Sequence, residues 1–162
     1  MSSAIRIRRS VFDRLIADVG TGADGMVMTH TVEQLRDAVA RDLESLLNTR
    51  SIVDFEDPAT TPWVRRSVLC FGVRDFVGRV LSNSEEQRHI GRSLAHAIQT
   101  HEPRLRDVSI VFNDAQGSTN SLSFTIRALL IVYPAKETVS FDAVLQPSLS
   151  QFAVTQARFV AA

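Results

Sequence analysis

The apolar positions in the first half of the chain recur at helical spacing. Between residues 32 and 48 they return every three or four positions. The apolar set consists of Val32, Leu35, Val39, Leu43, Leu46 and Leu47. This stripe is typical of an amphipathic helix, and Thr31 with Gln34 forms a capping-box pattern at its start. A shorter helix is predicted at 10–19, followed by a glycine-rich loop at 20–28.

A second amphipathic helix is predicted from Ser84 to a stop at Pro103. Its apolar stripe consists of Ile90, Leu94, Ala97 and Ile98. Proline ends the helix because it lacks a backbone N–H and its ring clashes with the preceding turn. Residues 49–66, between the two helices, are expected to be irregular, because Pro58 and Pro62 disfavour helix at the residues before them.

Beyond Arg104 the spacing of apolar residues changes from about 3.6 to about 2. Four alternating runs follow, at about 108–112, 124–130, 139–145 and 152–159, and turn residues or proline separate them. Short connections between consecutive runs favour an antiparallel meander. Helices first and strands afterwards predict an α+β fold, with N-terminal helices packed on a small, mainly antiparallel C-terminal sheet.

Length and composition describe one ordinary globular domain. The chain has 162 residues, of which 44% are apolar and 22% charged, values that are usual for a folded protein. We expect one domain over 31–162, preceded over 1–30 by the N-terminal helix and a flexible glycine-rich linker.

Charge and hydropathy exclude several classes of partner. Eighteen basic residues balance eighteen acidic ones, so no global field attracts nucleic acid or anionic lipid. No apolar run approaches the roughly 20 residues that span a bilayer, and the N-terminus lacks the apolar segment of a signal peptide. The single cysteine, Cys70, excludes an internal disulfide framework and fits a reducing compartment. We therefore expect a cytoplasmic protein without membrane insertion.

Two patterns suggest a cofactor or metal site, but the residues around each pattern do not meet the requirements of such a site. Residues 20–25 match G-x-G-x-x-G, but a dinucleotide site requires a strand before the motif and a helix opening at its end. Of the histidines, His89 and His96 share a helix face, whereas His101 lies about 140° away from His96. The zinc-protease spacing after His101 is also incomplete. We predict no metal and no cofactor.

Glycoside hydrolysis is an alternative because it needs only two carboxylates on either side of a bond. The available carboxylates are Asp42, Glu44, Glu102 and Asp107. However, Asp42 and Glu44 are two residues apart on a predicted helix and point in different directions. Nothing in the sequence isolates one carboxylate in an apolar pocket, as a general acid requires. Solvated or salt-bridged carboxylates are the simpler interpretation.

Glu102, Pro103 and Arg104 stand at the junction between the predicted helix and sheet. The proline fixes the backbone and holds two opposite charges in a short, stiff segment. Such a segment suits a rigid docking point, because little ordering entropy is lost on binding. The alternative is a helix stop with solvated charges.

Four segments carry motif-like sequences. Residues 42–50 read D-L-E-S-L-L-N-T-R, 102–105 read E-P-R-L, 67–75 read S-V-L-C-F-G-V-R-D, and 10–15 read S-V-F-D-R-L. Together they resemble the wedge protein family shared by type VI secretion baseplates and contractile-tail phages, sometimes labelled gene-25-like lysozyme. That family has an S-L-L-D-R-L opening in its secretion branch, followed along the chain by D-L-x-x-L-L-N-T-R, S-V-L-N-Y-G-x-P-D and E-P-R motifs, which is the order found here. The departures here are Cys70, Phe71 and Arg74.

The resemblance implies a non-enzymatic structural subunit of the baseplate of a contractile injection machine, of the type VI secretion kind. It implies assembly on the inner face of the cell envelope. Glu102, Pro103 and Arg104 would meet the helical bundle formed by the large wedge subunits. The other motif residues would have structural or binding roles: Asp42, Leu46, Leu47, Asn48, Thr49, Arg50, Ser67, Gly72 and Asp75.

The resemblance also implies that the sheet joins the first ring of the contractile sheath. An edge strand offers unpaired amides and carbonyls, so it can accept an extended segment of a sheath subunit by strand addition. The polar run from Gln151 to Arg158 is one candidate edge. A peptidoglycan-hydrolysing, lysozyme-like enzyme and a free-standing binding module with another partner are the two alternatives.

Overall fold

The computed structural model describes residues 32–53, 61–74, 84–113, 122–132, 135–146 and 151–156. The short helix predicted at 10–19, the glycine-rich segment 20–28 and the motif residue Asp75 lie outside this part of the chain. Within it, two long helices precede four strands, and this order confirms the predicted α+β class.

Helix α2 (Val32–Asn48) has the bounds that its apolar stripe predicts. Its buried side chains include Leu35, Val39 and Leu43, all exposed by 4% or less. The helix therefore forms because one face can be removed from water, while residues such as Asp37 and Arg41 stay exposed on the other face.

The segment after α2 contains two short helical elements, α3 (Pro62–Arg65) and the 3₁₀ turn η1 (Val68–Cys70). The expectation of an irregular stretch is wrong for α3. Pro62 occupies the first turn, where its missing N–H costs nothing, and the Thr61 side chain caps the helix by accepting from the Val64 amide. The turn η1 lies directly before Phe71 and Gly72, with Ser67 as its N-cap.

Helix α4 (Ser84–His101) begins at the predicted residue and ends just before Glu102 and Pro103. Its buried stripe is the predicted one, with Ile90, Leu94 and Ile98 at 0% exposure. Among the residues that the structure describes, no helix is both long and apolar enough to cross a membrane.

The strands form one antiparallel sheet in the order β1-β2-β3-β4, which confirms the predicted meander. They are β1 (Leu105–Phe112), β2 (Leu122–Val132), β3 (Ala135–Gln146) and β4 (Gln151–Gln156). The two edges of this sheet are therefore β1 and β4.

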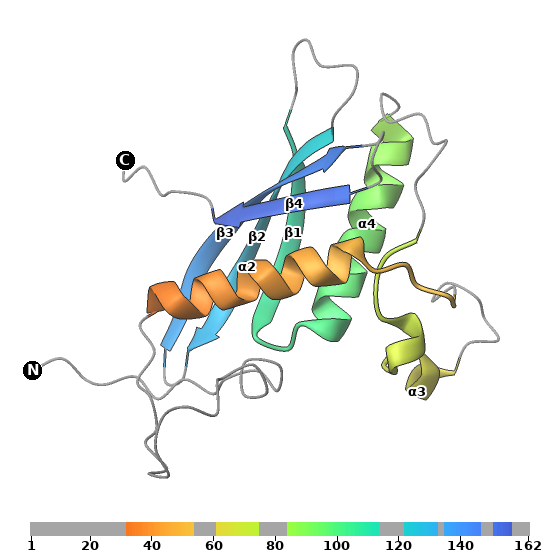
Figure 1. The fold of residues 1–162 in the computed structure, drawn as a ribbon, viewed down its shortest axis with the longest axis horizontal. Helices are drawn as coiled ribbons and strands as arrows, with labels where there is room; N and C mark the ends of the chain where they lie inside the picture. The colour runs from red at the N-terminus through yellow and green to blue at the C-terminus, as the bar shows by residue number, and fades with distance from the viewer. Residues whose placement is uncertain are drawn as a thin grey trace, which may run out of the picture.

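Both long helices cover one face of the sheet (Figure 1). Helix α2 packs against β4, and α4 packs against β1. Alternate strand residues, among them Phe124, Ile126 and Phe141, point into this layer and are fully buried. The 2-residue period of the strands and the helical period of α2 and α4 thus meet in one core.

Candidate functional site

The Glu102, Pro103 and Arg104 segment forms the corner between α4 and β1. The Glu102 amide donates to the Ile98 carbonyl at 2.8 Å, and the Arg104 carbonyl accepts from the Ile131 amide of β2 at 2.8 Å. The corner is therefore fixed to the helix on one side and to the sheet on the other.

The two charged side chains of the corner bind each other. Arg104 Nε donates to Glu102 Oε1 at 2.7 Å, and Arg104 Nη2 donates to Glu102 Oε2, a two-point contact of the strong kind. Arg104 Nη2 also donates to Asp42 of α2. The exposed fraction of the Glu102 side chain is 7% and that of Arg104 is 17%. The alternative of solvated charges is therefore wrong, because both charges are paired inside the chain.

The charge on Arg104 is held by its two acidic partners. Burial by itself lowers the pKa of the Arg104 guanidinium. The hydrogen bond and charge of Glu102, followed by those of Asp42, outweigh burial and raise this pKa above its ordinary value. The three side chains, here called the Arg104 cluster, join two motif segments that lie 62 residues apart in sequence.

Three of the carboxylates considered for hydrolysis are engaged by other groups of the chain. Asp42 binds Arg104, whereas Glu44 Oε2 accepts from the Val154 amide of β4 at 2.9 Å. The prediction that Asp42 and Glu44 point in different directions is confirmed. Glu102 is buried against Arg104, so it is engaged as an ion-pair partner.

The other motif residues join the end of α2 to the segment around η1. The Val73 amide donates to the Thr49 carbonyl at 2.9 Å, and the Ser51 amide donates to the Val73 carbonyl at 3.0 Å, around a parallel bridge between Arg50 and Val73. Gly72 has a φ of +112°, and a Cβ atom there would lie 2.4 Å from the Thr49 oxygen. Only glycine fits this crossing.

Asn48 has a role that sequence reasoning did not find. Its Nδ2 donates to the Phe152 carbonyl at 2.9 Å, and its Oδ1 accepts from the Phe152 amide at 2.8 Å. With Glu44 on Val154, α2 side chains therefore bind the outward-facing backbone of β4. The candidate edge runs from Gln151 to Arg158, and its described part, β4, is outermost in the described sheet, but α2 covers part of it. Leu46 and Leu47, in the same motif, are core residues.

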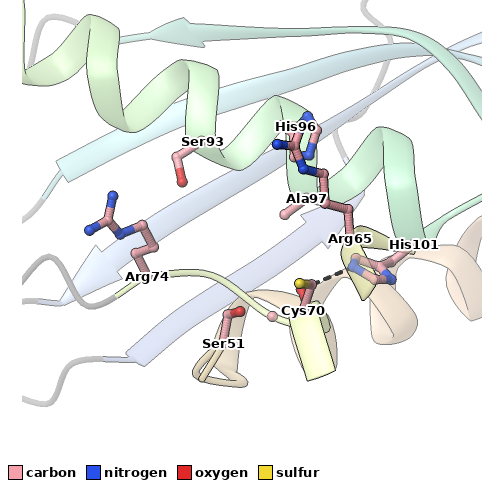
Figure 2. A pocket seen from close by; sticks show the side chains of 9 residues that line it. Ser51, Arg65, Cys70, Arg74, Ser93, His96, Ala97 and His101 are labelled. Atoms are coloured by element: carbon pink, nitrogen blue, oxygen red, sulfur yellow. Dashed lines mark hydrogen bonds between the residues drawn. The ribbon is translucent and has the colours of Figure 1, made fainter. Parts of the chain in front are cut away.

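A small pocket lies where α4 faces η1 and the residues after α2 (Figure 2). Its volume is about 10 Å³, which is about the room that one water molecule needs. The residues lining it are Ser51, Arg65, Cys70, Gly72, Arg74, Ser93, His96, Ala97 and His101. A sugar or nucleotide does not fit there.

His101 fastens η1 to the end of α4. Its Nε2 lies 3.0 Å from the Cys70 carbonyl oxygen, and its ring meets the Phe71 ring edge-on at 5.3 Å. Burial is the largest influence and lowers the pKa of His101; the Cys70 carbonyl opposes this, and the charge of His96 lowers the pKa further. The Cys70 side chain is buried.

Exposed apolar side chains gather on the segment that includes α3 and η1. The exposed fractions are 84% for Trp63, 82% for Val68 and 50% for Leu69. Residues 61–74 are here called the α3–η1 lobe, and in Figure 1 the lobe lies beside the C-terminal end of α4. Large apolar side chains with this exposure mark a surface that can bind another protein.

The fold and these contacts define an α+β domain whose motif segments hold one another in place. A model of the family described as baseplate wedge protein gp25 matches residues 33–135, which is more than half of the 162 residues. The chain therefore belongs to the baseplate wedge protein gp25 family, and the resemblance noted from the sequence is confirmed. The matched range includes the segments around Asp42, Gly72 and Arg104.

The chain is also similar to one in a solved structure titled "The baseplate complex from the type VI secretion system". The two share 16% sequence identity with a TM-score of 0.46, over 70% of this chain and 96% of that chain. No curated protein sequence matches this chain.

Proposed function

We propose that this protein is a structural, non-enzymatic subunit of the baseplate wedge in a contractile injection machine of the type VI secretion kind. The observation that carries the proposal is the family match over residues 33–135. The motif residues in that range support one another through the Arg104 cluster and the crossing of Gly72 with Thr49. The segment at 10–15, with its secretion-branch pattern, favours a secretion machine over a phage tail. The site of action is the cytoplasmic face of the cell envelope.

The corner and the α3–η1 lobe together are the proposed docking surface for the large wedge subunits. Glu102 and Arg104 contribute by fixing the corner, because their charges are paired internally. Pro103 is exposed at its tip. The lobe is tied to the same end of α4 through His101 and Cys70, and it adds exposed Trp63, a residue type that often dominates binding energy at interfaces.

A co-purification experiment tests this docking surface. The tagged full chain is expressed with the large wedge subunits of the same machine, and bound proteins are identified by mass spectrometry. Changing Trp63→Asp and Val68→Asp together is expected to reduce recovery of the wedge subunits by roughly tenfold or more, because hot-spot residues cost at least about 2 kcal/mol when lost. Both side chains are more than 80% exposed, so the fold itself is expected to be unaffected.

The control is Val111→Asp, which introduces one negative charge in place of an apolar side chain of β1 with an exposed fraction of 38%. This variant is expected to retain the wedge subunits. Full recovery with the Trp63 and Val68 variant would remove the lobe from the docking surface. Failure of the unchanged chain to recover any wedge subunit would argue against the wedge role itself.

The same proposal includes attachment of the first sheath ring to the sheet by strand addition. The described sheet has two edges, β1 and β4, that could accept such a strand. A peptidoglycan hydrolase is the weaker alternative, because Glu102 and Asp42 share Arg104 and Glu44 binds β4. We expect no clearing of cell walls by the folded protein; clearing that Glu102→Gln abolishes would favour the enzyme.

A further inference from the structure

The two edges of the sheet differ in how far their backbone is already bound. On β4, the Phe152 amide and carbonyl bind Asn48, and the Val154 amide binds Glu44. These are the groups that point away from β3. An incoming strand at β4 would have to displace three hydrogen bonds made by α2 side chains.

The register of β1 shows which of its groups point outward. The Asn113 amide donates to the Ser123 carbonyl of β2 at 2.9 Å. In an antiparallel pair the backbone groups of alternate residues point the same way, so the amides and carbonyls of Val111 and Ser109 also point toward β2. The amides and carbonyls of Ile110 and Phe112 therefore point to the open side of β1. Closer to the corner, the Val108 carbonyl accepts from the Gln99 side chain of α4 at 3.4 Å.

A groove runs along this open side, between β1 and α4. Its volume is about 840 Å³, and its lining includes Ile110 and Phe112 together with Gly91 and Ala95 of α4. These four residues form the apolar part of the lining, and Gly91 leaves room there for the Phe112 ring. A Cβ atom there would lie 3.1 Å from the Phe112 ring. A strand edge beside a helix groove is the arrangement in which backbone hydrogen bonds give affinity and alternate side chains enter a pocket.

The charged side chains that line the groove are two arginines, Arg88 and Arg92, and one carboxylate, Glu85, so positive charge prevails. Arg88 and Arg92 lie one helical turn apart on α4, line the groove and are exposed. They are placed to meet acidic side chains on whatever occupies the groove, since rim charges steer a partner and set its register.

We propose that the sheath segment adds to the β1 edge at Ile110–Phe112, in the groove beside α4, and does not add to β4. This inference rests on the proposed attachment of the sheath and specifies its site. The occupant is an extended segment of a sheath subunit, apolar at the alternate positions that face Gly91 and Ala95. An acidic residue of the segment meets Arg88 and Arg92.

Amide hydrogen exchange resolved by residue tests the proposal on the full chain. The probe is the purified sheath protein of the same machine. On its addition, exchange at the amides of Ile110 and Phe112 is expected to slow by roughly tenfold or more, because these groups become hydrogen-bonded. Exchange at Phe152 and Val154 is expected to stay unchanged.

Charge reversal provides the second arm. Arg88→Glu with Arg92→Glu is expected to weaken sheath binding by roughly tenfold or more. The matched control is Arg106→Glu with Arg127→Glu, which changes two exposed arginines that do not line the groove, and it is expected to bind normally. Equal binding by both double variants would overturn the acidic character of the occupant.

Three other outcomes would overturn the choice of edge. Protection that appears at Phe152 and Val154 would place the strand on β4. Protection of Ile110 in the isolated chain would mean that a segment of this chain, or a second copy, already occupies the groove. If the chain recovers the wedge subunits but the sheath protein leaves β1 exchange unchanged, the β1 site fails while the wedge role stands.

Discussion

At the scale of single residues, Arg104 joins two segments whose proximity the sequence does not reveal. The motif at 102–104 marks the position as important, and the helix pattern places Asp42 on a face of α2. Their contact depends on how α2 lies against the corner, which is a property of the assembled core. The Arg104 guanidinium donates twice to the Glu102 carboxylate and once to that of Asp42. The motif residue therefore also holds α2 against the corner.

Replacing Arg104 is therefore expected to destabilise the monomer. Arg104→Ala leaves Glu102 buried without its counter-charge, and removal of one partner from a buried ion pair costs about 3–5 kcal/mol. Urea unfolding of the isolated chain measures the loss. Arg106→Ala, two residues on and exposed, is the control and is expected to change the free energy of unfolding by no more than about 0.5 kcal/mol. Equal stability of the two variants would show that the cluster contributes little.

His101 gives the stability of the fold a pH dependence. Its pKa in the folded chain lies below the ordinary value of 6.5, so the unfolded chain takes up a proton first as the pH falls. The contribution of neutral His101 is therefore complete above pH 6.5 and is lost as the pH falls through 6.5 toward the folded pKa.

The comparison of wild type with His101→Gln isolates this effect, because glutamine can still donate to the Cys70 carbonyl. Unfolding free energies are measured at about pH 7.5 and about pH 5.5. The advantage of the wild type over the variant is expected to shrink at the lower pH. An advantage that is the same at both values would contradict the lowered pKa of His101.

At the scale of elements, the spacing of apolar residues and the positions of prolines and turn residues predict most of the described structure. Helix α2 and the start of α4 follow from their apolar stripes, and the four strands follow from the change of period after Arg104. Helix α3 does not follow from the pattern, because Pro62 disfavours helix at the residue before it and yet suits the first turn of a helix. The covering of β4 does not follow from it either, since it depends on the placement of α2 across the sheet.

The hydrogen bonds between Asn48 and β4 predict that Asn48→Ala lowers the free energy of unfolding. The change leaves the Phe152 amide and carbonyl without their partner, and an unsatisfied backbone group costs about 1–3 kcal/mol, less where water can reach it. We expect a loss of about 1–2 kcal/mol in urea unfolding and faster amide exchange at Phe152.

Ser45→Ala is the control for Asn48→Ala, because Ser45 lies on the same helix and is exposed. It is expected to leave both stability and the exchange at Phe152 near the wild-type values. If Asn48→Ala also left the exchange at Phe152 unchanged, the edge of β4 would be protected by something other than α2, and the contrast between the two sheet edges would weaken.

At the scale of the whole molecule, the described core lies within a continuous range of the sequence. Its first and last members are Leu35 and Val154, and the family match begins at residue 33. The division of the chain into a segment over 1–30 and a wedge domain over 31–162 stays a prediction, because the structure describes residues from 32 onward.

Deletion of residues 1–30 tests that division. Since the core cluster is retained, the shortened chain is expected to unfold cooperatively, with a free energy within about 1 kcal/mol of the full chain, against the roughly 5–15 kcal/mol typical of a domain. Thermal and urea unfolding of both chains measure the difference. The sheet face away from the helices carries the half-buried residues Leu129, Ile131 and Val144. A loss of several kcal/mol would mean that the first 30 residues contribute packing to the domain, for which this face is the first candidate, and the boundary would then move toward the N-terminus.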